Sequence, residues 1–233
     1  MFKSNTIFRN NTPVSTNIII INVLVWGACI ILGRKGIDLL NILGLHFVTA
    51  GEFKLFQFFT YMFVHSISSP AHLFFNMFAV FMFGRVIEST WGSARYLTFY
   101  LVTGIGAGII QQFAWWYDLH EVLVSTADII KFEDGAILPL AAYLNYFVTV
   151  GASGAVFGIL LAFGMMFPNV PLYIMFIPIP IKAKYVVIGY GIIELFSGIA
   201  HFSGDNIAHF AHLGGMLFGF VLIKIWQRRK PIG

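Results

Sequence analysis

Six apolar stretches of this chain are each close to the length that crosses a lipid bilayer. They lie near residues 16–33, 71–87, 95–116, 145–167, 182–200 and 207–226. A spanning helix needs about 20 predominantly apolar residues, and in hydrocarbon its backbone polar groups must bond within the segment. The sequence therefore predicts an all-α polytopic membrane protein with six transmembrane helices.

The shortage of charge supports the same interpretation. Only 10% of the 233 residues are charged, and 58% are hydrophobic, whereas an ordinary soluble domain carries about 25% charged residues. Too few polar side chains remain to coat a soluble globule. The single cysteine, Cys29, excludes an internal disulfide and a cysteine-rich metal site.

The basic residues predict the orientation. With the N-terminus inside the cell, ten of the 14 Lys and Arg residues fall in inner segments and four in outer ones. This bias favours cytoplasmic termini by the positive-inside rule. We expect a multi-pass protein of the plasma or inner membrane, with a cytoplasmic segment at 1–15, a membrane domain at 16–227 and a basic cytoplasmic tail at 228–233.

Two connections differ in composition. The connection 34–70 is rich in aromatic residues, and we expect it to lie partly in the membrane interface. The acidic connection 117–144 is typical of a solvated loop. Basic residues do not cluster along a face outside the C-terminal tail, so no nucleic-acid partner is predicted.

Two glycine-flanked polar residues lie inside apolar stretches. Ser153 follows Gly151 in the fourth stretch, and His212 precedes Gly214 in the sixth. Under the predicted topology both helices run inward, which places Ser153 about 8 residues and His212 about 5 residues below their outer ends, at roughly 8–12 Å depth. A serine becomes a nucleophile when a base takes its proton. The pair therefore predicts nucleophilic catalysis.

Glycine spacing gives a reason for the two helices to meet. Gly154 and Gly158 follow the serine four residues apart, and Gly215 and Gly219 follow the histidine at the same spacing. Small residues at this spacing let two helices approach closely. We therefore expect the fourth and sixth helices to touch there, although glycine is also common in membrane helices generally.

The second apolar stretch offers candidate oxyanion donors. His72 and Asn76 are four residues apart near its outer end, so they share a helix face. Together with the backbone N–H of Ser153, they are candidates to stabilise the oxyanion of a tetrahedral intermediate.

These motifs carry a resemblance to rhomboid intramembrane serine proteases, in order and in span position. The motifs are His72-x-x-x-Asn76, Gly151-x-Ser153-Gly154 and Ala211-His212-x-Gly214-Gly215-x-x-x-Gly219, with Glu88-x-x-Trp91-Gly92-Ser93 and the run from Pro178 to Lys184 beside them. The likeness covers roughly residues 50–226. It implies a six-helix bundle with an outward-open aqueous cavity, a Ser153–His212 dyad with no Asp orienting the base, and oxyanion or substrate binding by His72, Asn76 and Gly151.

Two positions depart from the family pattern. Phe56-Gln57 stands where rhomboids often carry Trp-Arg, and we expect this to alter the seating of the first connection rather than the chemistry. Phe157 stands where they often carry Tyr. A phenyl ring can still stack on imidazole, so Phe157 is expected to support His212, with Gly154, Gly215 and Gly219 supporting the helix contact.

Several residues have simpler alternatives. Ser153 is open to a bond with its own helix backbone, and His212 to plain packing between helices. His209, three residues earlier, competes as the base. Glu194 is expected to be a structural hydrogen-bond partner, with a proton relay as its alternative. His65 either holds the first connection by hydrogen bonding or is a plain interfacial histidine.

The predicted function is hydrolysis of peptide bonds in or near transmembrane segments of membrane proteins, with membrane lipids as surroundings. The fifth helix and the connection 201–206 are expected to act as gate and cap. No metal or other cofactor is predicted, since no His-Glu-x-x-His motif occurs, and no oligomeric state is predicted. The alternative is a non-proteolytic relative that binds client transmembrane helices, although such relatives typically lack the serine or the base.

Overall fold

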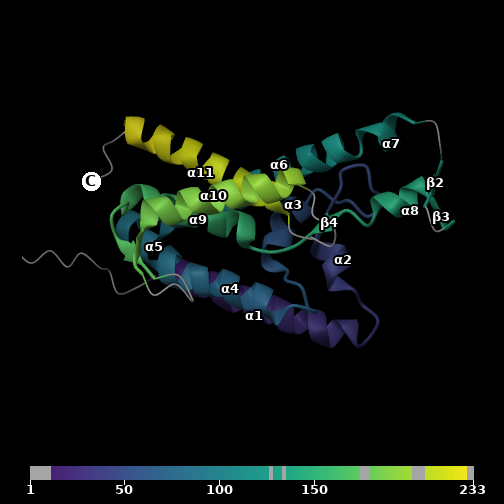
Figure 1. Ribbon diagram of the computed structural model, residues 1–233. Coiled ribbons are helices and arrows are strands. Elements are labelled where there is room, and N and C mark those ends of the chain that lie inside the picture. The colour runs from purple at the N-terminus through teal and green to yellow at the C-terminus, as the bar shows by residue number, and fades with distance from the viewer. Residues whose placement is uncertain (1–11, 126–127, 133–134, 174–178, 201–207, 230–233) are drawn as a thin grey trace, which may run out of the picture.

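The computed structural model describes residues 12–125, 128–132, 135–173, 179–200 and 208–229. It is a bundle of helices that lie side by side, with a small folded part beyond one end (Figure 1). Within the described residues, five helices are long and apolar enough to cross a membrane and one apolar helix is shorter. The prediction of a six-helix polytopic bundle is confirmed.

Most of the predicted spans correspond to observed helices. The five long ones are α1 (Pro13–Gly33), the helix formed by α4 (Pro70–Ala79), η2 (Val80–Gly84) and α5 (Arg85–Trp91), α6 (Ser93–Asp118), α10 (Ala183–Ala200) and α11 (His209–Arg229). η2 is a single π-helical segment within a continuous helix. Gly92, with φ of +83°, then allows the turn into α6.

The predicted fourth helix, 145–167, is wrong at its start. Helix α9 (Ser153–Met166) has only 14 residues, or about 21 Å of helix. The residues before it form an irregular segment that contains β4 (Val148–Thr149), antiparallel to β1 (Leu45–His46). Gly151 has φ of +127°, which an α-helix does not accommodate. An apolar run alone does not distinguish a covered extended segment from a helix.

The first connection is folded and packed against the bundle. It comprises α2 (Leu39–Leu43), β1, α3 (Gln57–Thr60) and η1 (Tyr61–Phe63). Gln57 is fully buried. Its amide accepts from the backbone N–H of His46 and Lys54 and donates to the carbonyls of Ile42 and Glu52. At the position where rhomboids often carry Arg, Gln57 thus joins four backbone groups of this connection.

The connection after α6 is more ordered than a plain solvated loop. It contains α7 (His120–Val124), β2 (Ile129–Lys131), β3 (Ile137–Pro139) and α8 (Leu140–Leu144), and β2 pairs with β3 as a hairpin. This part stands beyond the end of the bundle (Figure 1). A small second core, including Phe47 and Trp115, ties its base to the bundle. Farther along, β5 (Pro171–Leu172) pairs with β6 (Ile181–Lys182) between α9 and α10.

The bundle is apolar outside as well as inside. Leu24, Phe74 and Phe196 are each at least 60% exposed on their helices, as expected of surfaces that face lipid. The main core gathers Tyr96, Phe99 and other α6 side chains with those of α9.

Helices α9 and α11 meet at their glycines. A Cβ atom on Gly215 would overlap the carbonyl of Gly154, and one on Gly219 would lie 3.5 Å from the Cα of Gly158. Because the two pairs match in the same order along both helices, α9 and α11 are parallel. The contact lies where the glycine spacing predicts it.

Candidate active site

Ser153 is the first residue of α9, and the segment before it is held by the first connection. The N–H of Gly151 donates to the carbonyl of Tyr61 at 2.9 Å, and the N–H of Ala152 points to Nε2 of His65 at 3.4 Å. Ser153 is thus at a helix N-terminus, not eight residues inside a helix as predicted. At this position the first backbone N–H groups have no intrahelical partner.

Glycine at position 151 lets a histidine ring approach the backbone. A Cβ atom there would lie 2.8 Å from the His72 ring and 3.8 Å from Oγ of Ser153. His72 on α4 thus lies beside the segment that leads to Ser153. Because φ of Gly151 is also positive, both conformation and space require glycine there.

His65 is a fully buried residue of the site rather than an interfacial one. Its ring centroid lies 5.0 Å from that of His72. Burial, and to a smaller degree the neighbouring His72, lowers the pKa of His65 to about 3. The ring is therefore neutral at physiological pH, and Nε2 can accept from Ala152. Of the two roles expected for His65, hydrogen bonding is the one observed.

The two glycine-flanked polar residues meet. Oγ of Ser153 lies 2.8 Å from Nε2 of His212 on α11, and His212 is only 8% exposed. Their separation is that of an O–H···N hydrogen bond, which is the distance a nucleophile and its base require. The predicted alternative of a serine bonded to its own helix backbone is not the one observed.

Phe157 covers the imidazole of His212. The two rings are stacked, with centroids 4.2 Å apart and planes 8° apart. Phe157 lies one turn after Ser153 on α9, so nucleophile and stacking ring come from one helix. Tyr190 of α10 also contacts Phe157, in a T-shaped arrangement with ring centroids 6.1 Å apart.

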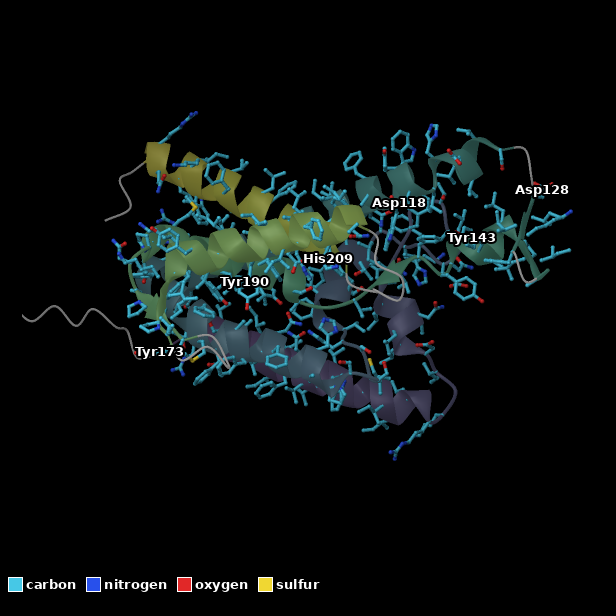
Figure 2. The ribbon with its side chains drawn as sticks, in the orientation of Figure 1. Asp118, Asp128, Tyr143, Tyr173, Tyr190 and His209 are labelled. Carbon is cyan, nitrogen blue, oxygen red and sulfur yellow. The ribbon has the colours of Figure 1, made fainter. Side chains whose placement is uncertain are left out.

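A carboxylate lies at the far side of the base. Oε2 of Glu194, on α10, is 2.9 Å from Nδ1 of His212 and 2.6 Å from Nδ1 of His209. Figure 2 labels His209, at the start of α11, together with Tyr190 on α10. The resemblance implies a dyad without an orienting Asp, and here a Glu occupies that place.

The same three residues are of metal-ligating types. One ligand atom each from Glu194, His209 and His212 lie within 4.8 Å of one another. Sequence spacing did not reveal this cluster, because Glu194 is on a different helix, 15 and 18 residues before its partners. The available signal was the depth of a carboxylate within an apolar stretch.

Asn76 lies one turn after His72 on α4. It is 6% exposed, and its Nδ2 donates to the carbonyl of His72 at 2.8 Å. A side-chain amide carries two hydrogens, so this bond uses one of them.

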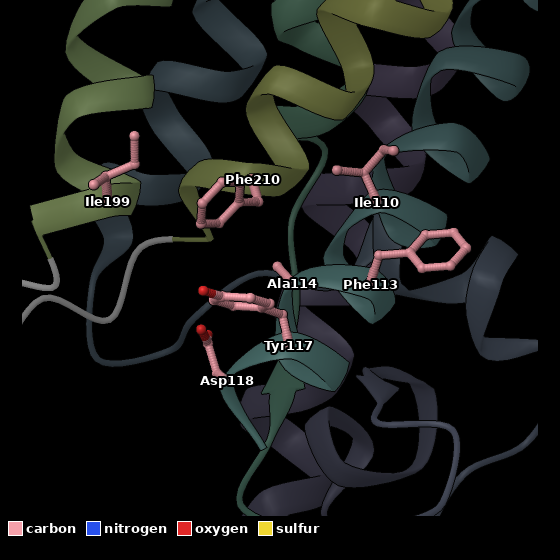
Figure 3. Close-up of a pocket in the computed structure, with 7 residues that line it drawn as sticks. All are labelled: Ile110, Phe113, Ala114, Tyr117, Asp118, Ile199 and Phe210. Atoms are coloured by element: carbon pink, nitrogen blue, oxygen red, sulfur yellow. The ribbon is translucent and has the colours of Figure 1, made fainter. Parts of the chain in front are cut away.

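A groove of about 510 Å³ lies elsewhere, where α6, α10 and α11 come together. Figure 3 shows its lining, which includes Tyr117 and Asp118 from α6, Ile199 from α10 and Phe210 from α11. Ser153 and His212 do not line it. The expected cap at 201–206 lies outside the described residues.

A family model described as the rhomboid domain matches residues 52–229. Rhomboid-like protein 11, chloroplastic, of Arabidopsis thaliana is 28% identical over 181 residues, which are 74% of this chain and 53% of that protein. Rhomboid protease AarA of Providencia stuartii is 32% identical over 92 residues, which are 40% of this chain and 28% of that protein. The chain thus matches about half of the first relative and less than a third of the second.

Proposed function

Because the chain belongs to the rhomboid family, we propose that it is an intramembrane serine endopeptidase. The observation that carries the proposal is the 2.8 Å contact between Oγ of Ser153 and Nε2 of His212. This contact joins two membrane helices in a protein with lipid-facing apolar surfaces. Polar residues at membrane depth are costly and commonly functional.

Ser153 is the nucleophile and His212 the base. His212 takes the hydroxyl proton as Oγ attacks the scissile carbonyl, and an acyl-enzyme forms when the amine leaves with that proton. Water then enters, gives a proton to His212 and attacks the ester. The product acid leaves and Ser153 regains its proton. The stacked Phe157 holds the imidazole in plane while it exchanges these protons.

The oxyanion develops beside the N-terminus of α9. The backbone N–H of Ser153 is a donor there, and the helix dipole favours negative charge at this end. His72 and Asn76 supply further donors from α4, and the missing side chain of Gly151 leaves room for the ring of His72. Loss of one such donor typically lowers turnover about 10²- to 10³-fold.

The substrates proposed are transmembrane proteins, cut near the outer membrane–water boundary. Both termini of the chain are proposed to face the cytoplasm of a plasma or inner membrane, on the bias of Lys and Arg described above. Helix α10 is proposed as the gate, because it covers Phe157 with Tyr190 and carries few core residues of its own.

Labelling with a fluorophosphonate probe tests the proposed function without knowledge of the substrate. The purified full chain in detergent is expected to be labelled at Ser153. Ser153→Ala and His212→Ala are expected to abolish labelling while keeping the helical circular dichroism of the wild type. Wild-type protein that resists the probe, or labelling that survives in Ser153→Ala, would contradict the proposal.

A further inference from the structure

We propose that Glu194 is a positioning residue for the base, so that Ser153, His212 and Glu194 of this chain work together as a Ser–His–Glu triad. The inference rests on the proposed function and deepens it. Its observations are the two contacts of one carboxylate oxygen, 2.9 Å to Nδ1 of His212 and 2.6 Å to Nδ1 of His209.

The first consequence concerns the tautomer of His212. An ionised carboxylate only accepts hydrogen bonds, so Nδ1 of His212 carries the hydrogen. In the neutral ring Nε2 is then the acceptor, and it is Nε2 that lies 2.8 Å from Oγ of Ser153. Glu194 thereby selects the tautomer in which His212 can take the serine proton.

The second consequence concerns charge. When His212 takes the proton it becomes an imidazolium in a site that is only 8% exposed, where an unpaired charge is disfavoured. Glu194 faces that charge directly. It therefore stabilises the protonated base during attack, as the buried carboxylate of a Ser-His-Asp triad does.

His209 has the supporting place in this cluster. Its Nδ1 donates to the same oxygen, so the carboxylate is held between two donors from successive turns of α11. This second bond fixes the side chain of Glu194 and reduces the cost of burying its charge. His209 thus acts through Glu194 rather than on Ser153.

The spacing is that of hydrogen bonds rather than of a metal site. Ligands about 2.0–2.2 Å from a tetrahedral zinc ion are about 3.4 Å from one another. The two contacts of Glu194 are 2.6 and 2.9 Å. Both are shorter than the edge of such a site, and short N···O separations are expected of charge-assisted N–H···O bonds.

The test measures the rate constant of fluorophosphonate labelling at a series of pH values. Among the residues that the structure describes, the titratable groups facing His212 are Glu194 on α10, His209 on its own helix and His72 on α4. In Glu194→Gln the rate constant should fall by at least about 10²-fold, given the about 10⁴-fold loss on the equivalent change in a triad. The acid limb of the profile should also move to lower pH, because the amide no longer stabilises the protonated imidazole.

Glu88→Gln is the matched control, since Glu88 is also a buried carboxylate but bonds backbone and hydroxyl donors. It should lower thermal stability without moving the acid limb or the rate constant. The rate constant counts only folded molecules, so partial unfolding of Glu194→Gln does not imitate the effect. If that variant does not fold, Glu194→Asp decides: it should react more slowly, because its shorter side chain withdraws the carboxylate from His212.

The outcomes separate the two proposals. Wild-type protein that is not labelled, or labelling of Ser153→Ala, contradicts the proposed protease. Labelling of the wild type but not of Ser153→Ala, together with a wild-type rate and profile in Glu194→Gln, overturns the role of Glu194 alone. A wild-type rate in Glu194→Asp overturns it equally when the Gln variant is unfolded.

Discussion

Two buried carboxylates in this bundle have opposite kinds of partner. Glu88, 2% exposed, accepts from the backbone N–H groups of Val14 and Ser15 and from the hydroxyl of Ser93. Glu194, 8% exposed, lies within hydrogen-bond distance of Nδ1 of two imidazoles. A buried charge needs donors in either place. The kind of donor determines whether the carboxylate serves stability alone or also affects a titratable group.

The partners of Glu88 do not titrate in the ordinary pH range. Val14 and Ser15 are in the first turn of α1, where N–H groups have no intrahelical partner. Glu88 satisfies two of them from another helix and also holds the start of α6 through Ser93. Its contribution is therefore to stability. The partners of Glu194 are titratable imidazoles, and Nε2 of one of them, His212, lies 2.8 Å from Oγ of Ser153, so the contribution proposed for Glu194 is to reactivity.

The largest effect should separate the two partners of Glu194. His212→Ala is expected to lower fluorophosphonate labelling by at least about 10⁴-fold, because it removes the base itself. His209→Ala should lower it by about 10-fold or less, because Glu194 keeps its bond to His212. The measurement is the labelling rate constant of each purified variant. Equal losses would show that the two histidines share one role and would break the assignment of the base.

The next effect tests whether the contact of α9 and α11 sets the separation of Ser153 and His212. In Gly215→Ala the added Cβ overlaps the carbonyl of Gly154. Helix α11 must therefore shift, and the shift moves His212 away from Ser153. A displacement of about 1 Å can cost about 10²-fold in rate, and that is the expected loss in labelling. Gly189→Ala is the control, since a Cβ on Gly189 of α10 meets no atom within 4 Å. If Gly215→Ala is labelled as fast as this control, the contact of α9 and α11 does not determine the separation of Ser153 and His212.

Glu88 should matter for stability and not for labelling. Glu88→Ala should lower the free energy of unfolding by about 3 kcal/mol, because it leaves the α1 N–H groups and the Ser93 hydroxyl without their charged acceptor. Denaturant titration in detergent would measure the loss. The labelling rate constant of the folded fraction should stay within about twofold of the wild type, because the bonds of Glu88 go to Val14, Ser15 and Ser93 and not to Ser153 or His212. A large fall in that rate constant would remove the distinction between the two carboxylates.

The sequence predicts only part of this difference between Glu88 and Glu194. Ser153 and His212 can be predicted to meet, because glycines at helical spacing mark the faces where their helices approach. The bundle follows from the lengths of the apolar stretches. Glu194 appears in the sequence only as a carboxylate at membrane depth, because its bonds depend on how α10 is rotated and placed against α11. That rotation is set by tertiary packing, which apolar composition does not encode.

The start of α9 is a second feature that depends on tertiary contacts and that hydropathy does not predict. Residues 145–152 contain Phe147, Val148 and Val150 and carry no charge, so hydropathy joins them to the helix that follows. Pairing with β1, the bond from Gly151 to Tyr61 and the positive φ of Gly151 make them irregular instead. These constraints come from the first connection, about 90 residues earlier in the case of Tyr61. They place Ser153 at a helix N-terminus, which is the better location for stabilising an oxyanion.

The smallest effect should come from the ring that covers the base. Phe157→Leu removes the stacked partner of His212 but keeps an apolar side chain, and such ring pairs contribute about 0.5–1.5 kcal/mol beyond buried area. The labelling rate constant should therefore fall only about 2- to 10-fold. Phe157→Tyr retains a ring for stacking and should lose less than Phe157→Leu. Because the ring touches the imidazole face and not Nδ1, the acid limb of the pH profile should stay in place in both variants, unlike in Glu194→Gln. A shift of that limb in Phe157→Leu would mean that packing, and not the Glu194 carboxylate, sets the protonation of His212.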